Sequence, residues 1–257
     1  MSAGKVWFVG AGPGAPDLLT LRGARVIAAA DVVIWAASLV MAATVTDHAR
    51  YDAQIVDSSG LTLEEVCAIY DRAAAAGLQV ARVHSGDPSL WGAVGEQIAA
   101  CEARGLGWEI VPGVSSLAAA AAAVGRELTA PEVAQSVILT RLATATPMPA
   151  GEEVRAFARH GTTMALFLSA KRADAVQREL LAGGYPPDTP CAVVYKATWP
   201  DEQVQHCALD DLAATLRSMG VRKHTLILVG RALEAGGTRS KLYDPGFSHE
   251  FRTGAAP

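Results

Sequence analysis

Three glycine-containing segments carry residue types that could hold a small polar ligand. They are V-G-A-G-P-G-A-P-D at 9–17, V-H-S-G-D-P-S-L-W-G at 83–92 and I-V-P-G-V-S-S-L-A-A-A at 110–120. Each follows an apolar run typical of a β-strand. Glycine lets a ligand approach the backbone, while carboxylates and hydroxyls offer hydrogen bonds. Three such loops at the carboxyl ends of strands in one parallel sheet can converge on a single ligand.

The first segment has more than one interpretation. Gly10, Gly12 and Ala15 match the G-x-G-x-x-[GA] pattern of a nicotinamide-dinucleotide loop, with Asp31 sixteen residues beyond Ala15. The prolines of this segment weaken that interpretation, because proline has no N–H to donate to a phosphate. Asp31 also precedes its strand, whereas a ribose-binding carboxylate is expected near a strand's end. A tight turn at which a ligand meets backbone fits better, and a purely structural turn stays open.

The other two segments offer polar side chains beside a glycine bend. In the second, Asp87 can accept hydrogen bonds from a ligand, or it can be the N-cap of a helix that Pro88 opens. Spacing alone leaves these alternatives open. In the third, the chain turns through Gly113 into a helix that begins with the hydroxyls of Ser115 and Ser116.

The elements that must position these segments predict an α/β protein of two domains, 1–113 and 114–257. Before Gly113, strands are expected at 5–9, 32–35, 78–84 and 108–111, and helices at 21–30, 63–76 and 91–103. This alternation predicts a mainly parallel sheet. After Gly113, strands are expected at 136–140, 163–168, 191–195 and 225–229, with helices at 117–124, 154–159, 172–181 and 209–219.

Composition narrows the classes of partner. The 257 residues are 51% hydrophobic and hold 22 Lys and Arg against 26 Asp and Glu, which excludes the broad basic surface of a nonspecific nucleic-acid binder. Up to Gly113 there are seven basic and twelve acidic residues, and after it fifteen and fourteen. The cations are therefore concentrated in the second half, where we expect any anionic ligand to be held.

Neither a membrane nor a metal is expected. The stretch 26–45 is almost entirely apolar, but Asp31 divides it into the end of a helix and a buried strand. The four cysteines have no C-x-x-C spacing and the chain opens without a signal-peptide pattern, which favours the cytoplasm. The histidines show no metal-ligand spacing.

Taken together, the three segments resemble the signatures of the tetrapyrrole methylases, enzymes that use S-adenosylmethionine to methylate uroporphyrinogen and precorrin carbons. The resemblance extends along nearly the whole chain: D-L-L-T-L-R at 17–22, A-D-V-V at 30–33, A-T-W-P-D at 197–201 and the strand at 225–230 also fit in order. It implies the fold of class III S-adenosylmethionine-dependent methyltransferases, with the active-site cleft between two α/β domains, and commonly a homodimer.

Within that family, several stretches are similar to the branch that methylates C11 of precorrin-4 in cobalamin biosynthesis. They are A-S-L-V at 37–40, R-V-H-S-G-D-P-S-L-W at 82–91, G-R-E-L-T-A-P-E-V-A-Q at 125–135, I-L-T-R at 138–141 and S-K-L-Y-D-P-G-F-S-H-E-F-R at 240–252. The last stretch distinguishes the chain from relatives that act on uroporphyrinogen or ribosomal RNA. The resemblance leaves open whether the substrate is metal-free precorrin-4 or its cobalt form.

The resemblance also assigns residues to the donor S-adenosylmethionine and its product S-adenosylhomocysteine. The matching positions are Pro13, Ser85, Gly86, Asp87, Leu90, Ser115, Ser116, Leu168, Ala197 and Thr225. Leu168 stands where relatives commonly have Met. We expect Asp87 to orient the donor.

For the substrate's carboxylates, the candidates are cations near strand ends of the second half, namely Arg141, Lys171, Arg172 and Lys196, with Arg141 favoured by its place in a branch motif. An electron-rich ring carbon needs little activation, so no side chain is assigned as catalytic. His84, Asp87 and Tyr195 are the titratable groups near the predicted strand ends. Two alternatives remain: a nicotinamide-dependent oxidoreductase, and a non-catalytic tetrapyrrole-binding or carrier protein.

Overall fold

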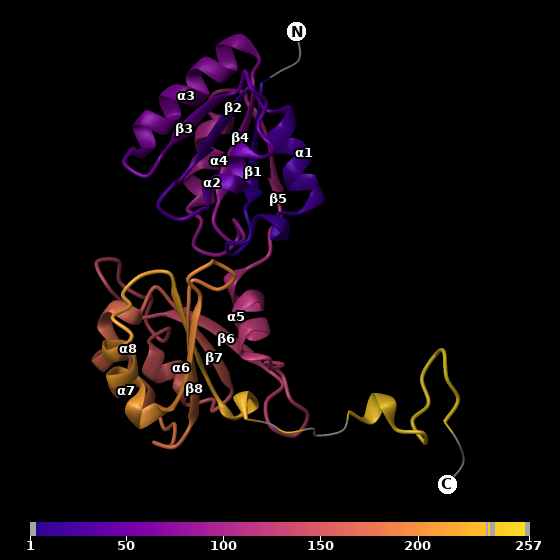
Figure 1. Ribbon diagram of the computed structural model, residues 1–257, viewed down its shortest axis with the longest axis vertical. Coiled ribbons are helices and arrows are strands. Elements are labelled where there is room, and N and C mark those ends of the chain that lie inside the picture. The colour runs from indigo at the N-terminus through magenta and orange to yellow at the C-terminus, as the bar shows by residue number, and fades with distance from the viewer. Residues whose placement is uncertain (1–3, 235, 237–239, 255–257) are drawn as a thin grey trace. The chain divides into compact units, whose positions relative to one another are not determined.

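The computed structural model describes residues 4–234, 236 and 240–254, which form two compact units (Figure 1). Unit 1 comprises the chain up to Ala119 together with Lys196–Glu202, and unit 2 comprises Ala120–Tyr195 and the chain from Gln203 onward. Each unit contains one five-stranded sheet with helices packed on it. The predicted α/β class is confirmed.

The sheet of unit 1 is parallel throughout, as predicted. Its strands are β1 (Lys5–Gly10), β2 (Val32–Trp35), β3 (Gln54–Asp57), β4 (Gln79–His84) and β5 (Gly107–Val111), in the order β3-β2-β4-β1-β5. The carboxyl ends of all five strands therefore lie at one edge of the sheet, which we call the carboxyl edge. The edge strand β3, with its largely exposed sequence Q-I-V-D, was not predicted.

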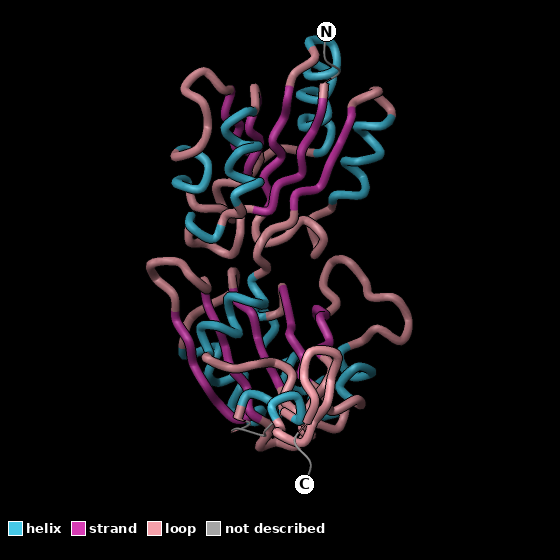
Figure 2. The backbone as a smooth tube through the Cα atoms, turned by 90° about the vertical axis from the view of Figure 1, so that its right-hand side faces the viewer, coloured by secondary structure: helices cyan, strands magenta, loops and turns pink. Residues whose placement is uncertain are grey.

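Helices lie on both sides of this sheet (Figure 2). On one side are α3 (Leu63–Ala76) and α4 (Val94–Glu102), and on the other α1 (Leu21–Ala29) and the unpredicted α2 (Ala42–Thr46). Strand side chains alternate between the two sides: Ile34 packs with α3 and α4, and Trp35 with α1 and α2. The apolar stretch 26–45 is thus divided among α1, β2 and α2. No helix in the described part of the chain is both long enough and apolar enough to span a bilayer.

Local capping explains where the helices of unit 1 begin. The Thr62 side chain accepts from the backbone N–H of Glu65, whose carboxylate accepts from the backbone N–H of Thr62, so α3 starts at Leu63 as predicted. The helix expected from 91 begins only at Val94. Trp91 and Ala93 have φ values of 54° and 49°, which α-helical backbone cannot adopt.

The sheet of unit 2 is mixed rather than parallel. It has the order β6-β7-β10-β8-β9, and only the β6–β7 pair is parallel. Its strands are β6 (Val137–Arg141), β7 (Thr163–Phe167), β8 (Pro190–Tyr195), the unpredicted β9 (Gln203–Ala208) and β10 (Thr225–Val229). An antiparallel neighbour needs no crossover helix, which is why β8 and β9 are joined by a short segment.

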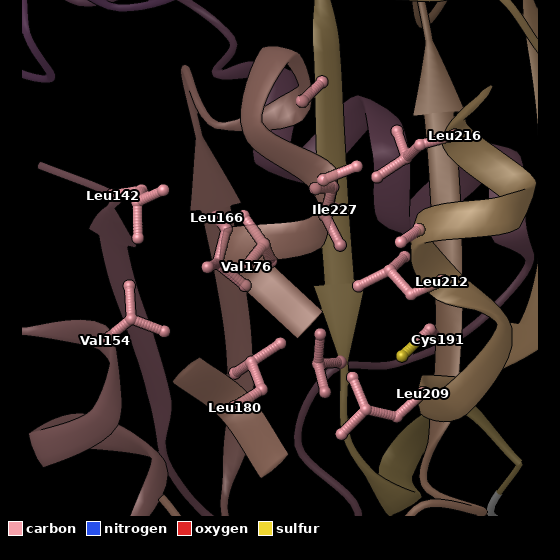
Figure 3. Packing of buried hydrophobic residues seen from close by; sticks show 14 of the residues in the cluster. Leu142, Val154, Leu166, Val176, Leu180, Cys191, Leu209, Leu212, Leu216 and Ile227 are labelled. Atoms are coloured by element: carbon pink, nitrogen blue, oxygen red, sulfur yellow. The ribbon is translucent and has the colours of Figure 1, made fainter. Parts of the chain in front are cut away.

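Apolar residues of three helices fill one side of this sheet (Figure 3). Leu180, Leu212 and Leu216 are almost completely buried against Leu166 and Ile227 of the strands. The helices are α6 (Val154–Ala158), α7 (Ala173–Ala182) and α8 (Leu212–Ser218), while α5 (Ser116–Val124) spans the division between the units. Short 3-10 helices η1 to η5 occupy Pro16–Leu18, Ala170–Arg172, Leu209–Asp211, Arg231–Leu233 and Lys241–Tyr243.

Backbone meets backbone at the carboxyl edge of unit 1. A Cβ atom added to Gly10 would lie 2.5 Å from the Cα of Gly113 and 2.8 Å from the carbonyl oxygen of Gly86. A Cβ at Gly113 would collide with the same oxygen and lie 2.7 Å from the Cα of Gly10. These glycines are needed for close packing between loops, whatever their own φ values.

This contact predicts that Gly113→Ala destabilises the protein by about 2 kcal/mol or more, because overpacking forces backbone to move. The matched change is Gly95→Ala in α4, where an added Cβ has no neighbour within 4 Å. It should stabilise by roughly 0.5–1 kcal/mol, since alanine is the better helix former. Urea unfolding measures both changes. Equal effects of the two substitutions would contradict the close packing.

Candidate functional site

The three glycine loops meet because β4, β1 and β5 are neighbours in the sheet. Gly86 N–H donates to Gly12 O at 2.8 Å, and Gly12 N–H donates to Gly86 O at 3.2 Å. Ala11 N–H donates to His84 O at 2.7 Å, which continues the β1–β4 ladder into the loops. The loops therefore lie side by side, as predicted, while their convergence on one ligand stays a prediction.

Asp87 joins the second loop to the third. Its Oδ2 accepts from the backbone N–H of Gly113 at 2.8 Å, and its Oδ1 accepts from the N–H and hydroxyl of Ser89. Partial burial alone would raise the pKa of Asp87, but these hydrogen bonds outweigh it and hold the pKa below its usual value. The alternative of Asp87 as a helix N-cap is wrong, because α4 begins at Val94 with Ala93 as its N-cap.

The remaining candidates on these loops frame the space beside Gly86. A Cβ added to Gly86 would be in ordinary van der Waals contact with Ser116 N and Ser115 Cα, at 3.8 and 3.9 Å, so Gly86 is packed less tightly than Gly10 and Gly113. Ser115 turns the chain into α5, since its hydroxyl accepts from the N–H of Leu117. Leu90 is half-buried in the turn that follows Asp87. Ser85, by contrast, is exposed.

A segment from the second half of the sequence completes the first loop. Trp199 Nε1 donates to Pro13 O at 2.9 Å, and Ala15 N–H donates to the Thr198 hydroxyl at 2.9 Å. Gly14 is required beneath the indole, because a Cβ there would lie 2.5 Å from Trp199 Nε1. The candidate Ala197 is thereby brought, 7% exposed, to the neighbourhood of Pro13. Sequence reasoning assigned no role to Thr198 or Trp199, which contact partners 183 and 186 positions away.

In unit 2, three candidates lie at one edge of the sheet. Arg141 ends β6 opposite Phe167, Leu168 follows β7, and Thr225 begins β10 opposite Tyr195. Leu168 is unusual, since this apolar side chain is 66% exposed and its φ is 53°. A bulky residue held in the left-handed region costs free energy and points to a functional constraint on the backbone.

The candidate cations are largely engaged within the protein. The Arg141 guanidinium donates to the carbonyls of Leu142, Thr146 and Pro147, and so holds the loop after β6. Lys196 Nζ lies 2.6 Å from a carboxylate oxygen of Asp201. Of the other two candidates, both in η2, Arg172 donates to the carbonyl of Ala143, and Lys171 is exposed. Their proposed contact with a substrate stays a prediction.

His84 closes β4 at the start of the second loop. The imidazole is 9% exposed, packs on Phe8 with ring centroids 6.0 Å apart, and its Nε2 makes no hydrogen bond within the described residues. Burial, reinforced by the nearby charge of Arg82, lowers the pKa of His84 to about 3. The side chain is therefore neutral at physiological pH.

Asp31 does not suit a ribose-binding role. It precedes β2, at the opposite end of the strand from the loops, and its Oδ2 accepts from Gln79 N–H at 2.8 Å. Its Oδ1 lies 3.3 Å from Arg50 Nη1. The dinucleotide interpretation of the first loop is therefore wrong, because the Asp31 carboxylate, which would have to bind the ribose, lies at the opposite end of the strand from the loops.

The sequence is similar to those of known proteins along most of its length. The family model of the tetrapyrrole (corrin/porphyrin) methylases matches residues 5–213. The chain is 45% identical over 249 residues to the cobalt-precorrin-4 C(11)-methyltransferase of Methanocaldococcus jannaschii, covering 96% of each chain. It is 47% identical over 240 residues to the precorrin-4 C(11)-methyltransferase of Mycobacterium tuberculosis, covering 93% of this chain and 95% of the relative.

Two solved structures extend the likeness to the fold. The cobalt precorrin-4 methyltransferase CbiF superposes with a TM-score of 0.87 at 42% identity, over 90% of this chain and 96% of that one. The uroporphyrin-III C-methyltransferase of Thermus thermophilus, complexed with S-adenyl homocysteine, gives 0.75 at 30% identity, over 90% and 99%. The chain belongs to the tetrapyrrole methylase family and has its α/β fold.

The buried, neutral His84 predicts an acid-sensitive fold. The folded pKa of His84, about 3, lies below the ordinary value of 6.5, so between these pH values only the unfolded protein takes up the proton. His84 therefore leaves stability unchanged above pH 6.5 and lowers the free energy of unfolding progressively as the pH falls toward 3. In His84→Gln this contribution is lost, so the slope of the unfolding free energy against pH should be smaller than in the parent by up to about 1.4 kcal/mol per pH unit. Urea unfolding of both proteins between pH 7.5 and 4.5 measures the slopes, and parallel curves would contradict the prediction.

Proposed function

We propose that this chain is an S-adenosylmethionine-dependent methyltransferase that methylates C11 of precorrin-4 to give precorrin-5 in cobalamin biosynthesis. The observation that carries the proposal is 45–47% identity to C11-methyltransferases over 93–96% of the chain. The meeting of three loops at the carboxyl edge of unit 1 supports it, because open parallel sheets bind their ligands there.

The described residues of unit 1 fit a donor of this kind. Gly10 and Gly113 are packed closely against the second loop, whereas Gly86 is packed less tightly and faces Ser115 and Ser116. We assign the donor to these residues and to Pro13, Ser85, Asp87, Leu90 and Ala197, which lie on the same loops or on the segment that packs against them. Leu168 and Thr225, which the family resemblance also assigns to the donor, belong to unit 2 and stay predictions.

The protein's task in this reaction is positioning. When bound, S-adenosylmethionine supplies an electrophilic methyl group on a sulfonium, and an electron-rich ring carbon of the tetrapyrrole displaces the sulfur in line. The loops need only hold the partners at near-attack distance, which by itself can lower the barrier by several kcal/mol, about 7 or more in favourable cases. Neutral His84 and the hydrogen-bonded Asp87 shape the carboxyl edge of unit 1, and neither acts as a nucleophile.

The metal state of the substrate is decided by experiment, since relatives with both names match the chain about equally well. Purified protein is incubated with methyl-labelled S-adenosylmethionine and enzymatically made precorrin-4, with and without cobalt. Label at C11 in either product is expected and identifies the substrate form. Label at another carbon, or a macrocycle that binds without gaining label, would contradict the proposal. The cytoplasmic location and the homodimer stay predictions.

Asp87 gives a sharper test of the donor site. Asp87→Ala removes the carboxylate that holds Gly113 and Ser89, so affinity for S-adenosylhomocysteine should fall by roughly tenfold to a hundredfold, the range for a hydrogen bond to a charged group. Asp71→Ala is the control, because Asp71 is an exposed carboxylate paired with Arg104. Isothermal titration calorimetry measures both, and a Kd of Asp87→Ala within twofold of the parent would sink the assignment.

A further inference from the structure

A partly buried cation lies near the carboxyl edge of unit 1. Arg82 projects from β4 and makes two side-chain hydrogen bonds, from Nε to Gln97 Oε1 at 3.0 Å and from Nη1 to the Ser58 hydroxyl at 2.8 Å. The Tyr70 hydroxyl donates to the same Gln97 oxygen at 3.1 Å. Burial lowers the pKa of Arg82, yet a guanidinium stays protonated in proteins. The cluster therefore carries one positive charge.

No carboxylate of the described chain neutralises this charge. Arg82 takes part in none of the ion pairs within residues 4–234, 236 and 240–254, and its partners Ser58 and Gln97 are uncharged. Burial raises the pKa of Tyr70, so that phenol is uncharged as well. The acid beside Ser58, Asp57, accepts instead from Ala37 and Ser59. Removing part of a guanidinium from water without a counter-charge costs free energy, and an anion would offset that cost.

His84 adds an independent observation. It lies two residues beyond Arg82 on the same strand, so both side chains are on the same side of the sheet. Its buried Nε2 has no partner among the described residues, although buried polar atoms are nearly always hydrogen-bonded. In the tautomer that carries the proton on Nε2, neutral His84 is a hydrogen-bond donor. A cation and an unused donor are thus adjacent on one strand.

This cluster adjoins the glycine loops. Trp35 ends β2, Ser58 follows β3 and His84 ends β4, and the Ser58 hydroxyl donates to Trp35 O at 3.0 Å. The cluster therefore occupies the carboxyl edge over β3, β2 and β4, whereas the glycine loops occupy the same edge over β4, β1 and β5. Strand β4 is common to both. Half-buried Ser58 keeps the cluster close to solvent at this edge.

We propose that Arg82 and His84 form a binding site for a carboxylate of a bound ligand. The planar guanidinium has donors left over for a bidentate contact, which suits a carboxylate better than a single-point anion. The ligand's identity rests on the proposed function: the carboxylate is either that of the amino-acid end of the donor or an acidic side chain of the tetrapyrrole. The site lies in the more acidic half of the sequence, where composition alone gives no reason to expect it.

Arg82→Met separates binding from folding. The substitution leaves no orphaned group, since Gln97 Oε1 keeps the Tyr70 hydroxyl and Ser58 keeps its bond to Trp35 O. Without ligand, the variant should therefore unfold at the same urea concentration as the parent or a higher one. Arg82→Lys restores the charge without the planar fork. The matched control is Arg104→Met, which removes a guanidinium whose partners are Asp71 and the carbonyl of Ala100.

Two probes distinguish the sources of the carboxylate. Calorimetry with S-adenosylhomocysteine and its decarboxylated analogue tests the donor, and fluorescence titration with uroporphyrin III tests an eight-carboxylate tetrapyrrole. Arg82→Met should lose about tenfold or more in affinity for one probe, Arg82→Lys should lose less, and Arg104→Met should stay within twofold of the parent. If the donor is the source, the parent's preference for S-adenosylhomocysteine over its decarboxylated analogue disappears in Arg82→Met.

The inference is overturned if Arg82→Met binds both probes within twofold of the parent. It is equally overturned if the variant unfolds at a clearly lower urea concentration, because Arg82 then serves the fold. The proposed function can fail while the inference holds. In that case the parent transfers no label to precorrin-4, but its binding of uroporphyrin III is still weakened by Arg82→Met. A parent chain that binds neither probe overturns both.

Discussion

The contact between glycine backbones at the carboxyl edge of unit 1 is the constraint on which the candidate site depends. Gly10, Gly86 and Gly113 approach so closely that an added Cβ at Gly10 or Gly113 would collide with backbone. Asp87 secures this contact by accepting the N–H of Gly113. The parallel order β4-β1-β5 makes the approach possible, because it brings three consecutive strand ends to one place. The loops are therefore held together by close backbone packing and single hydrogen bonds rather than by long hydrogen-bonded elements.

Around this contact, polar groups fall into two kinds. Some make hydrogen bonds within the protein, such as the carboxylate of Asp87 and the guanidinium of Arg141. Others lack a matching partner among the described residues: partly buried Arg82 has no counter-charge, and buried Nε2 of His84 has no hydrogen bond. Folding alone does not account for the second kind, since each costs stability. At Arg82 and His84 we infer that a ligand's carboxylate supplies the missing interaction.

Much of the fold followed from local pattern. Buried strands such as Val32–Trp35 and Thr225–Val229 are short apolar runs, and Leu63–Ala76 has a capping box at its start, so their bounds could be predicted closely. The largely exposed edge strand Gln54–Asp57 and the strand Gln203–Ala208 lack that signal. Their pairing is set by neighbours distant in the sequence. For the same reason the antiparallel pairs of unit 2 were not predicted.

The sequence by itself determined the family, the three glycine loops and the strands that present them, because residue type and spacing dictate turns and elements locally. Only the tertiary structure decided what those residues touch. It brought Trp199 to Pro13 across 186 positions, showed that Asp87 accepts the N–H of Gly113 rather than capping a helix, and left Arg82 partly buried without a counter-charge. A hydrogen bond or a buried charge depends on distances that no local pattern encodes, and the packing of the sheet sets those distances.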